Sequence, residues 1–306
     1  MAVNVRTHRP VRNLNERISR WAGKSPLQCL QEVGADWKAE MVDLQTVTGI
    51  KVEDKKAILN PITNKILGIA GTGYTPMHNR TLADSMSQLA ESLGQPIEIT
   101  EAFNTAGGKL VGLAGKIGEG ESIIPGDDVI PIISIAQGNA ANYLLKFRFE
   151  LMRLVCSNGS RVPVDGMSTV FHLRHTKTVE ARYTLNFETV LKNFDEMQNG
   201  MLAAFRKFAT HKLSLAGATS FFRDIAKVKG DKDKKAEQTV EDLLQVYNHP
   251  RQVIAGETLW RAYNAATEYL QHWGYRSDES MIIANLDGKA TEHKDAAYTL
   301  ALALAS

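Results

Sequence analysis

The segment Leu145-Lys-Phe-Arg-Phe-Glu-Leu-Met-Arg153 decides the fold that this sequence predicts, because apolar and charged residues alternate along it. Successive side chains of a β-strand point to opposite faces of its sheet. One face therefore receives the apolar set, Leu145, Phe147, Phe149 and Leu151. The other face receives Lys146, Arg148 and Glu150. We predict a half-exposed strand that buries its apolar face and presents its cations to solvent.

A second alternating segment follows at Thr169–His175, and cations continue around both segments. Arg and Lys on an exposed sheet face neutralise phosphates, and each contact adds to a salt-dependent affinity. Aromatic residues between them stack on bases where they are exposed. The alternative is that the phenylalanines belong to the core and that the cations form an ordinary solvated face. The spacing is equally consistent with both interpretations.

The pattern changes from strand-like to helical along the chain. Strand-like segments run from Trp37 to Ala136, with a helix at Asn79–Leu93 and a Gly107-Gly108 turn. Beyond Val179 the apolar spacing is helical. This order predicts an α+β fold, in which a largely antiparallel sheet with flanking helices precedes a helical C-terminal part. We divide the chain into an N-terminal helical arm (1–35), a strand-rich α+β core (36–180) and a helical C-terminal region (181–306).

Three helices have distinctive sequence signals. Ser25-Pro26 has the N-cap and first-turn proline of a helix start. Asn79 is expected to cap the helix that ends at Leu93. The segment Glu257–Trp273 has one apolar stripe, which we expect to pack on the sheet or on a neighbouring subunit.

The composition is that of an ordinary globular protein. Hydrophobic residues make up 43% and charged residues 23% of the 306 residues, and the formal net charge is +2. Nucleic-acid binding would therefore depend on local clustering of cations. Cys29 and Cys156 give no disulfide framework, and no apolar stretch is long enough to span a bilayer. We expect a soluble, cytoplasmic protein with no membrane partner.

Nucleotide-binding and metal-binding motifs are incomplete in this sequence. Gly71-Thr-Gly73 lacks the third glycine of a dinucleotide-binding loop, and no P-loop motif occurs. His172 and His175 are three residues apart, so on a strand they point to opposite faces and do not converge on a metal. We predict no metal and no cofactor.

One enzymatic alternative stays open. Cys156 with His172 or His175 would form a thiol hydrolase if the fold brought them together, because such a site is defined by geometry and not by sequence order. A cysteine within an apolar segment is more often buried and inert. The acids at Asp127-Asp128 and Asp287–Glu292 lack the spacing of a calcium loop. We predict no catalytic residue, and therefore a protein that is not an enzyme.

Six short segments occur in a characteristic order along most of the chain. They are Gly73-Tyr-Thr-Pro76 with Asn79, Gly126-Asp127, Arg153-Leu-Val-Cys-Ser-Asn-Gly159, Arg174-His-Thr176, Gly256-Glu-Thr-Leu-Trp260 and Asn264-Ala-Ala-Thr-Glu-Tyr269. This ordered set resembles the phage/plasmid-like family of uncharacterised proteins from bacterial mobile elements. The chain departs from that family at Gly159, where many members have threonine, and in the Asp231–Lys235 tract.

The resemblance implies a role in phage or plasmid DNA metabolism without specifying a reaction. A strand-rich core followed by helices is also loosely similar to RecT/Redβ-like single-strand annealing proteins. Those proteins form oligomeric rings or filaments and hold DNA in a cationic groove. The similarity implies single-stranded DNA as a partner, a homo-oligomer (ring or filament) and a location in the host cell cytoplasm.

We therefore predict an ATP-independent single-stranded DNA-binding and strand-annealing protein that acts in recombination. The residues expected to contact phosphates are Lys146, Arg148, Arg153, Arg161, Arg174, His175, Lys177 and Arg182. The residues expected to stack on bases or to bond the DNA backbone are Tyr143 or Phe147, and Asn139 or Asn158. The alternatives are a cysteine- or metal-dependent enzyme and a host-interaction or anti-defence protein of a mobile element. The DNA-binding prediction requires Arg148 and Arg174 on the exposed side of one sheet.

Overall fold

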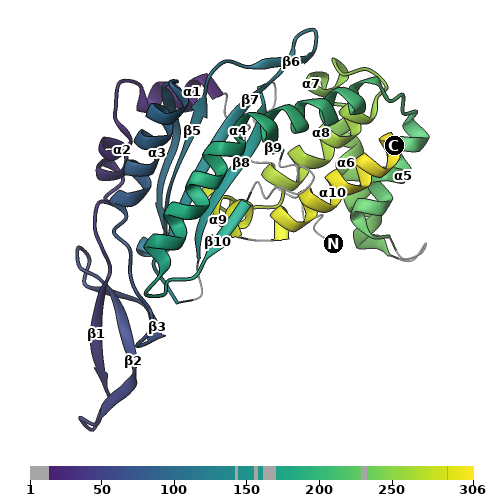
Figure 1. Cartoon of the computed structure of the whole chain (residues 1–306). Helices are drawn as coiled ribbons and strands as arrows, with labels where there is room; N and C mark the ends of the chain where they lie inside the picture. The colour runs from purple at the N-terminus through teal and green to yellow at the C-terminus, as the bar shows by residue number, and fades with distance from the viewer. Residues whose placement is uncertain (1–13, 142–143, 155–157, 161–169, 229–232, 288) are drawn as a thin grey trace.

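The computed structural model describes residues 14–141, 144–154, 158–160, 170–228, 233–287 and 289–306. Two antiparallel sheets with helices come first along the chain, and a mainly helical part follows (Figure 1). The predicted α+β class is therefore confirmed. The last strand ends at Leu173 and the long helix α4 begins at Val179, close to the predicted change from strands to helices.

Within the described residues, the larger sheet has seven strands, and all of their pairings are antiparallel. Its strand order is β10-β8-β7-β5-β4, while β6 pairs with β7 and β9 pairs with β8. The strands are β4 (Ile97–Thr105), β5 (Leu110–Ile117), β6 (Glu121–Ile124), β7 (Asp127–Gly138), β8 (Leu145–Arg153), β9 (Asn158–Ser160) and β10 (Val170–Leu173). β8 lies between β7 and β10, so it is an interior strand with a partner on each side.

The first face of this sheet packs against helices, as the apolar side of β8 predicts. These helices are α2 (Pro26–Glu32), α3 (Arg80–Leu93) and α4 (Val179–Thr210). The Phe147 ring lies 6.3 Å from that of Phe187 on α4, and the Phe149 ring lies 5.0 Å from that of Phe194. Both aromatic pairs meet edge to face, which is a favourable arrangement for buried rings.

The second face is also covered, and this overturns the prediction of a half-exposed β8. Helix α9 (Asp278–Asp287) packs Ile282 and Ile283 onto Phe103, Leu110 and Ala136 of that face. At the other end of the face, helix α1 (Leu14–Trp21) packs near β4. Lys146 and Arg148 keep only 2% and 3% of their surface exposed. The alternating pattern located the two faces correctly, but the second face meets protein from both ends of the chain instead of water.

Helices of the C-terminal part form a second region of the same hydrophobic core. They are α5 (Leu215–Ala226), α6 (Lys234–Tyr247), α8 (Leu259–His272) and α10 (Lys289–Ala305), and the short α7 (Pro250–Val253) packs against α8. α8 is central, since it packs against α4, α5, α6 and α10. Its side chains are buried almost all the way around, against these helices and against β9, so of the two predicted alternatives the stripe packs within its own chain.

The smaller sheet, which we call the β-arm, consists of β1 (Glu40–Gln45), β2 (Lys51–Asn60) and β3 (Lys65–Gly71). It projects from the body, as Figure 1 shows. The buried amide of Asn60 attaches its base by donating to the Gly107 carbonyl at 3.5 Å. One face of β3 approaches the body at Gly68, where an added Cβ would lie 3.6 Å from that of Ala140.

Local signals at helix starts gave mixed results. The Ser25 hydroxyl accepts a hydrogen bond from the Gln28 amide, and the Gln28 side chain accepts from the Ser25 amide, which completes a capping box. Asn79 precedes α3 but its side chain makes no capping bond, so that prediction is wrong. Among the helices that the structure describes, none is both long enough and apolar enough to cross a membrane.

The close approach of β4, β5 and β7 at Gly112 gives a stability prediction. A Cβ at this position would lie 2.2 Å from Cζ of Phe103 and 2.8 Å from the Ile135 carbonyl oxygen. We expect Gly112→Ala to destabilise the fold by about 1–3 kcal/mol, because the backbone of β7 has no room to move away. Gly73→Ala is the control, since its Cβ would meet nothing within 4 Å. Equal urea midpoints for both variants would contradict this packing.

Candidate functional site

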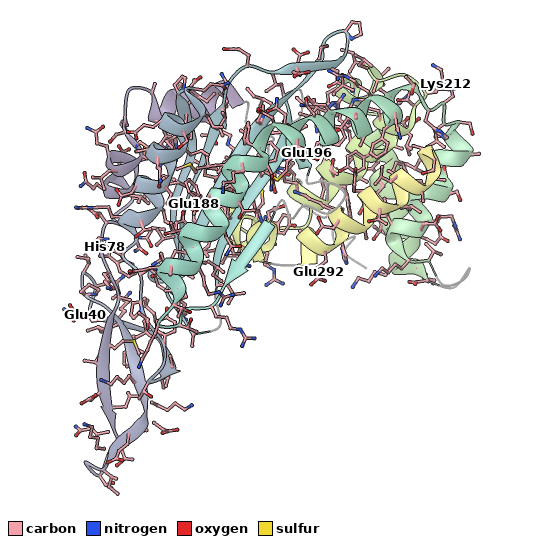
Figure 2. The ribbon with its side chains drawn as sticks, in the orientation of Figure 1. Glu40, His78, Glu188, Glu196, Lys212 and Glu292 are labelled. Carbon is pink, nitrogen blue, oxygen red and sulfur yellow. The ribbon has the colours of Figure 1, made fainter. Side chains whose placement is uncertain are left out.

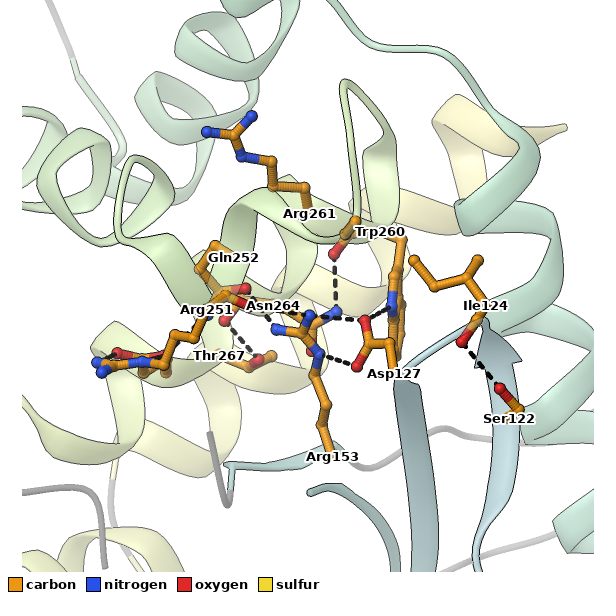
Figure 3. Close-up of polar contacts among 12 residues, drawn as sticks. Ser122, Ile124, Asp127, Arg153, Arg251, Gln252, Trp260, Arg261, Asn264 and Thr267 are labelled. Atoms are coloured by element: carbon orange, nitrogen blue, oxygen red, sulfur yellow. Dashed lines mark hydrogen bonds and ion pairs between the residues drawn. The ribbon is translucent and has the colours of Figure 1, made fainter. Parts of the chain in front are cut away.

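Four of the six characteristic segments meet in one buried ionic cluster, drawn in Figure 3. Asp127 begins β7 and Arg153 ends β8 next to it, because the antiparallel register places Arg153 opposite Val129. Trp260 and Glu268 come from α8. Two residues from α7 complete the ionic cluster, Arg251 and Gln252.

The centre of the ionic cluster is a bidentate pair between Arg153 and Asp127. Nε of Arg153 donates to Oδ1 of Asp127 at 2.5 Å, and Nη2 donates to Oδ2 at 2.6 Å. The Trp260 indole N–H donates to the same carboxylate at 2.9 Å. Nη1 of Arg153 donates to Oε1 of Gln252 at 2.5 Å. This fork geometry is the strongest form of the arginine–carboxylate interaction.

A second carboxylate, Glu268, extends the ionic cluster toward the surface. Its Oε2 accepts from Nε of Arg251 at 2.9 Å and from Nε2 of Gln252 at 2.8 Å, and its Oε1 accepts from Nη2 of Arg251. Asp127 and Glu268 are fully buried. Two arginines balance two carboxylates, so the ionic cluster holds no net charge. Its carboxylate oxygens are occupied by strong donors, which favours a structural role over acid–base or metal chemistry.

One of the remaining two segments contributes Asn79 to an amide cluster beside the β-arm, which Gln137 and Asn139 complete. Nε2 of Gln137 lies 3.0 Å from Oδ1 of Asn79 and 3.1 Å from Oδ1 of Asn139. Nδ2 of Asn139 donates to Oδ1 of Asn79 at 3.1 Å and to the Gly108 carbonyl at 3.1 Å. Gln137 also donates to the Met77 carbonyl at 2.7 Å. The amide cluster joins the end of β7 to the loop before α3.

His175 lies next to this cluster and joins β10 to the loop that follows the β-arm. Its carbonyl accepts a hydrogen bond from the Thr75 amide at 3.1 Å, and its ring lies 5.1 Å from that of Tyr74. The imidazole is buried and neither ring nitrogen has a hydrogen bond of standard geometry within the described residues. Burial lowers the pKa of His175 below its ordinary value, although nearby backbone groups of Thr75 and Gly138 partly oppose this shift.

The predicted nucleic-acid-binding residues fall into three groups. Those buried in the structure are Lys146, Phe147, Arg148, Arg153, His175 and Asn139. Those exposed are Arg174, Lys177 and Arg182. Those outside the described residues are Arg161 and Tyr143, together with the side chain of Asn158, whose backbone belongs to β9.

The expectation that Arg148 and Arg174 share one exposed sheet face is wrong. Arg148 points to the second face and donates to the Asn285 carbonyl of α9, whereas Arg174 follows the end of β10 and is exposed. In this conformation the six buried residues do not present their side chains to an external ligand. The exposed cations therefore form a smaller set, at one end of the sheet.

Sequence reasoning missed most of both clusters. The sequence suggests Asp127 as a cation ligand or strand start and places Glu268 in an amphipathic helix, and both lie in the characteristic segments, but nothing in the sequence shows that they are buried with arginines. Gln137 gave the clearest available signal, because it is a polar residue in the apolar run of β7. The donors that offset the cost of burying the Glu268 carboxylate come from α7, and only the tertiary structure shows that contact.

The thiol hydrolase alternative rests on Cys156, whereas the cysteine that the structure describes is Cys29. Burial raises the pKa of the Cys29 thiol to about 11, which leaves little thiolate at neutral pH. In the part of the chain that the structure describes, no group of three or more His, Cys, Asp or Glu side chains is placed to hold a metal. Cys156 and the side chain of His172 lie outside that part.

A hollow of about 300 Å³ lies between the β5–β6 turn and the middle of α4. Its polar lining includes Gln95, Glu119, Asp195 and Asn199. Glu119 and Asp195 are exposed, so neither has the desolvated environment that usually marks a catalytic acid or base.

The chain belongs to a family defined by a domain of unknown function (DUF932), whose model matches residues 66–296. Both buried clusters lie within the matched residues, whereas β1 and β2 of the β-arm precede them. No curated protein and no solved structure matches the chain. Family membership therefore supplies no reaction, and the function has to be argued from the geometry.

The ionic cluster gives the first prediction for this site. Asp127→Ala leaves the Arg153 guanidinium buried without its bidentate partner, so we expect a loss of about 3–5 kcal/mol of folding free energy. Glu121→Ala is the matched control, because it breaks a 2.8 Å ion pair with Arg206 in which both side chains are about half exposed. The control should lose less than about 1 kcal/mol. Similar losses in chemical denaturation would show that the ionic cluster does not couple sheet and helices.

His175 gives a pH prediction. The unfolded chain takes up a proton at His175 near the ordinary pKa of 6.5, whereas the folded pKa is lower. Below pH 6.5 the unfolded state therefore binds more protons, and the stability contributed by neutral His175 is lost as the pH falls. We expect His175→Gln to lose less stability than wild type between about pH 7.5 and about pH 5.5, measured by urea unfolding. An unchanged pH slope would rule out this linkage.

Proposed function

We propose that this protein binds single-stranded DNA and promotes strand annealing without ATP, as a homo-oligomer of a phage or plasmid system. The observation that carries the proposal is the cation loop, which we define as Arg174 and Lys177 together with Arg182 in the first turns of α4. All three side chains are exposed. Within the described residues they form no side-chain hydrogen bond or ion pair, so their charges are available to phosphates.

Local charge supports binding at this end of α4 and opposes it along the middle. Near the cation loop the one acid on α4 is Glu180. Farther along the exposed side of the same helix lie Glu188, Asp195 and Glu196, two of them labelled in Figure 2. A phosphate backbone would be repelled there, which restricts the proposed path to the end of the sheet beside the β-arm.

The buried amide cluster and His175 support the proposal by positioning the cation loop. The Thr75–His175 backbone hydrogen bond and the Tyr74–His175 ring contact attach the loop to the segment that leaves the β-arm. A loop fixed in this way loses less conformational freedom on binding than a mobile one. His175 and Asn139, first expected to touch DNA, would thus act by holding the cations in place.

Other cations near the base of the β-arm contribute less. Arg80 is held by Asp36, through Nε at 3.1 Å and Nη2 at 2.7 Å. Lys38 pairs with His78 through a backbone bridge and is exposed. The charge of Arg80 is thus compensated, whereas Lys38 has no side-chain ion pair within the described residues, and the three cations of the cation loop are the larger group to test by substitution.

We expect the double variant Arg174→Glu/Lys177→Glu to bind a labelled oligonucleotide of about 20 nucleotides at least tenfold more weakly than wild type. The slope of log affinity against log salt should fall by about 1.4, because two phosphate contacts of about 0.7 each are lost. Fluorescence anisotropy across a salt series measures both quantities. Annealing of complementary oligonucleotides without ATP, followed by fluorescence quenching, should slow in parallel.

The matched control is Lys192→Glu/Lys207→Glu, which reverses two exposed cations of the same helix away from the β-arm. It should bind DNA within about twofold of wild type, since removal of an uninvolved charge acts only through screened long-range fields. Equal loss in the two double variants would overturn the residue assignment. A wild-type protein that shows no salt-sensitive anisotropy change would overturn the proposed function.

A further inference from the structure

The β-arm concentrates exposed apolar side chains that its own chain leaves uncovered. Among the described residues ten large hydrophobic side chains are exposed, and six of them belong to the β-arm and its turns. These six are Val42, Val47, Ile50, Ile62, Ile66 and Ile69. Such a gathering on one small sheet differs from scattered surface apolar residues and marks an interaction surface.

Strand register places several of these side chains on one face. Ala57 of β2 pairs with Val42 on β1 and with Ile69 on β3, so the three form a row across the sheet. The next row on that face pairs Leu59 with Ile66. We call these two rows the apolar face of the β-arm.

A β-bulge is responsible for this apolar face. The register between β2 and β3 shifts so that Ile58 pairs with Gly68 while Leu59 pairs with Ile66. Leu67 is the extra residue of the bulge, and in a regular strand Ile66 and Ile69, which are three positions apart, would point to opposite sides. Ile66 and Ile69 are 60% and 56% exposed, whereas Gly68 on the opposite face lies against the body.

The charges that flank the apolar face are self-complementary. Glu40 pairs with Leu59 and therefore lies on this face at the end near the body, where Figure 2 labels it. Lys55 lies on the same face toward the tip, opposite Gly71. Both side chains are exposed, and Lys55 has one long intrachain ion pair, with Oδ2 of Asp54 at 3.9 Å. An antiparallel pairing of two identical faces brings Glu40 of one copy to Lys55 of the other, twice by symmetry.

We infer that the apolar faces of two β-arms pack against each other around a two-fold axis, so that the β-arm is the self-association surface of this protein. The inference deepens the proposed function and rests on its oligomeric part. Burial of Ile66 and Ile69 supplies the hydrophobic contribution, and the Glu40–Lys55 pairs fix the antiparallel direction. α8 cannot supply an interface, since its side chains are buried in the core.

Nucleic acid is a poorer occupant of this face. The opposite side of the β-arm pairs Asp43 with Lys51 and Lys56, each at 3.2 Å, so those cations are already neutralised. Glu40 on the apolar face would repel phosphate. A second copy satisfies the apolar and the charged positions together.

Size-exclusion chromatography with light scattering, at about 20 µM protein and without DNA, tests the inference directly. Wild type should have at least twice the monomer mass, and Ile66→Glu/Ile69→Glu should have the monomer mass. Leu215→Glu is the matched control, because Leu215 on α5 is 53% exposed and lies outside the β-arm. A monomeric wild type, or a double variant that associates as wild type does, would overturn the inference.

Reversing the charges of Glu40 and Lys55 tests the antiparallel arrangement itself, because these variants keep the apolar side chains of the β-arm. Glu40→Lys and Lys55→Glu should each raise the dimer dissociation constant about tenfold in sedimentation velocity, because two pairs become repulsive. The combined variant Glu40→Lys/Lys55→Glu should return to near the wild-type value. If the combined variant is as weak as the single ones, the antiparallel arrangement is wrong. Both substituted side chains are exposed, so these variants should fold as wild type does, and a change in the dissociation constant would reflect the interface.

Parallel measurements keep this result distinct from DNA binding. Arg174→Glu/Lys177→Glu should keep the wild-type mass while losing oligonucleotide affinity. Ile66→Glu/Ile69→Glu should bind a single short oligonucleotide as a monomer. Loss of mass with retained DNA binding supports the β-arm assignment, whereas association through DNA alone in all variants contradicts it.

Discussion

The bidentate pair between Arg153 and Asp127 is the interaction on which the two halves of this fold depend. It joins the end of β8 to the start of β7, and it is completed by Gln252 and Trp260 from the helical part. Taking both charges out of water costs several kcal/mol for each ion, and only well-placed donors repay that cost. Without the C-terminal helices the pair would lack the hydrogen bonds with Gln252 and Trp260. The sheet and the C-terminal helices must therefore assemble together, and they share one hydrophobic core.

Because both faces of the larger sheet are covered, the cations of β8 are not available to a ligand, and a binding surface must lie elsewhere. Alternation along β8 separates Lys146 and Arg148 from Phe147 and Phe149, as a half-exposed strand requires. The same alternation arises when the second face meets other parts of the protein, and Arg148 does so through the Asn285 carbonyl. The cations of β8 are thus interior groups. Surface charge available to an anionic partner lies instead where the chain leaves β10 for α4.

Parts of this fold that depend on neighbours in sequence were predictable. The capping box at Ser25 and the turn at Gly107-Gly108, where both glycines have positive φ, follow from local stereochemistry. The antiparallel order follows from short strands with tight turns. By contrast, α9 covers a face formed by residues more than a hundred positions earlier. Asn79 looked like a helix cap, but Gln137 and Asn139 compete for its oxygen.

The candidate site also shows that sequence patterns do not predict contacts between residues far apart in the chain. Arg174, Lys177 and Arg182 were chosen for their charge, and they are exposed. Charge is also the reason for predicting Arg153, which is the most deeply buried of the predicted phosphate contacts that the structure describes. Sequence spacing does not distinguish these cases, because burial of an arginine requires a carboxylate from another strand. Asp127 is 26 residues away along the chain and becomes a neighbour only through the β7–β8 register.

The β-arm and the cation loop are also connected, and this connection gives the proposed function a geometry. Strand β3 ends at Gly71, the Tyr74 amide donates back to the Gly71 carbonyl, and the Thr75 amide donates to His175. The short segment from Gly71 to Thr75 therefore connects the β-arm, through the hydrogen bond to His175, to the cation loop. Antiparallel pairing of two β-arms would place the two cation loops at opposite ends of the pair. Like charges would then stay apart, and each copy would hold its own strand. In the proposed annealing, two DNA strands are held on separate copies and are brought together when the copies associate. A single groove on one copy would hold only one strand.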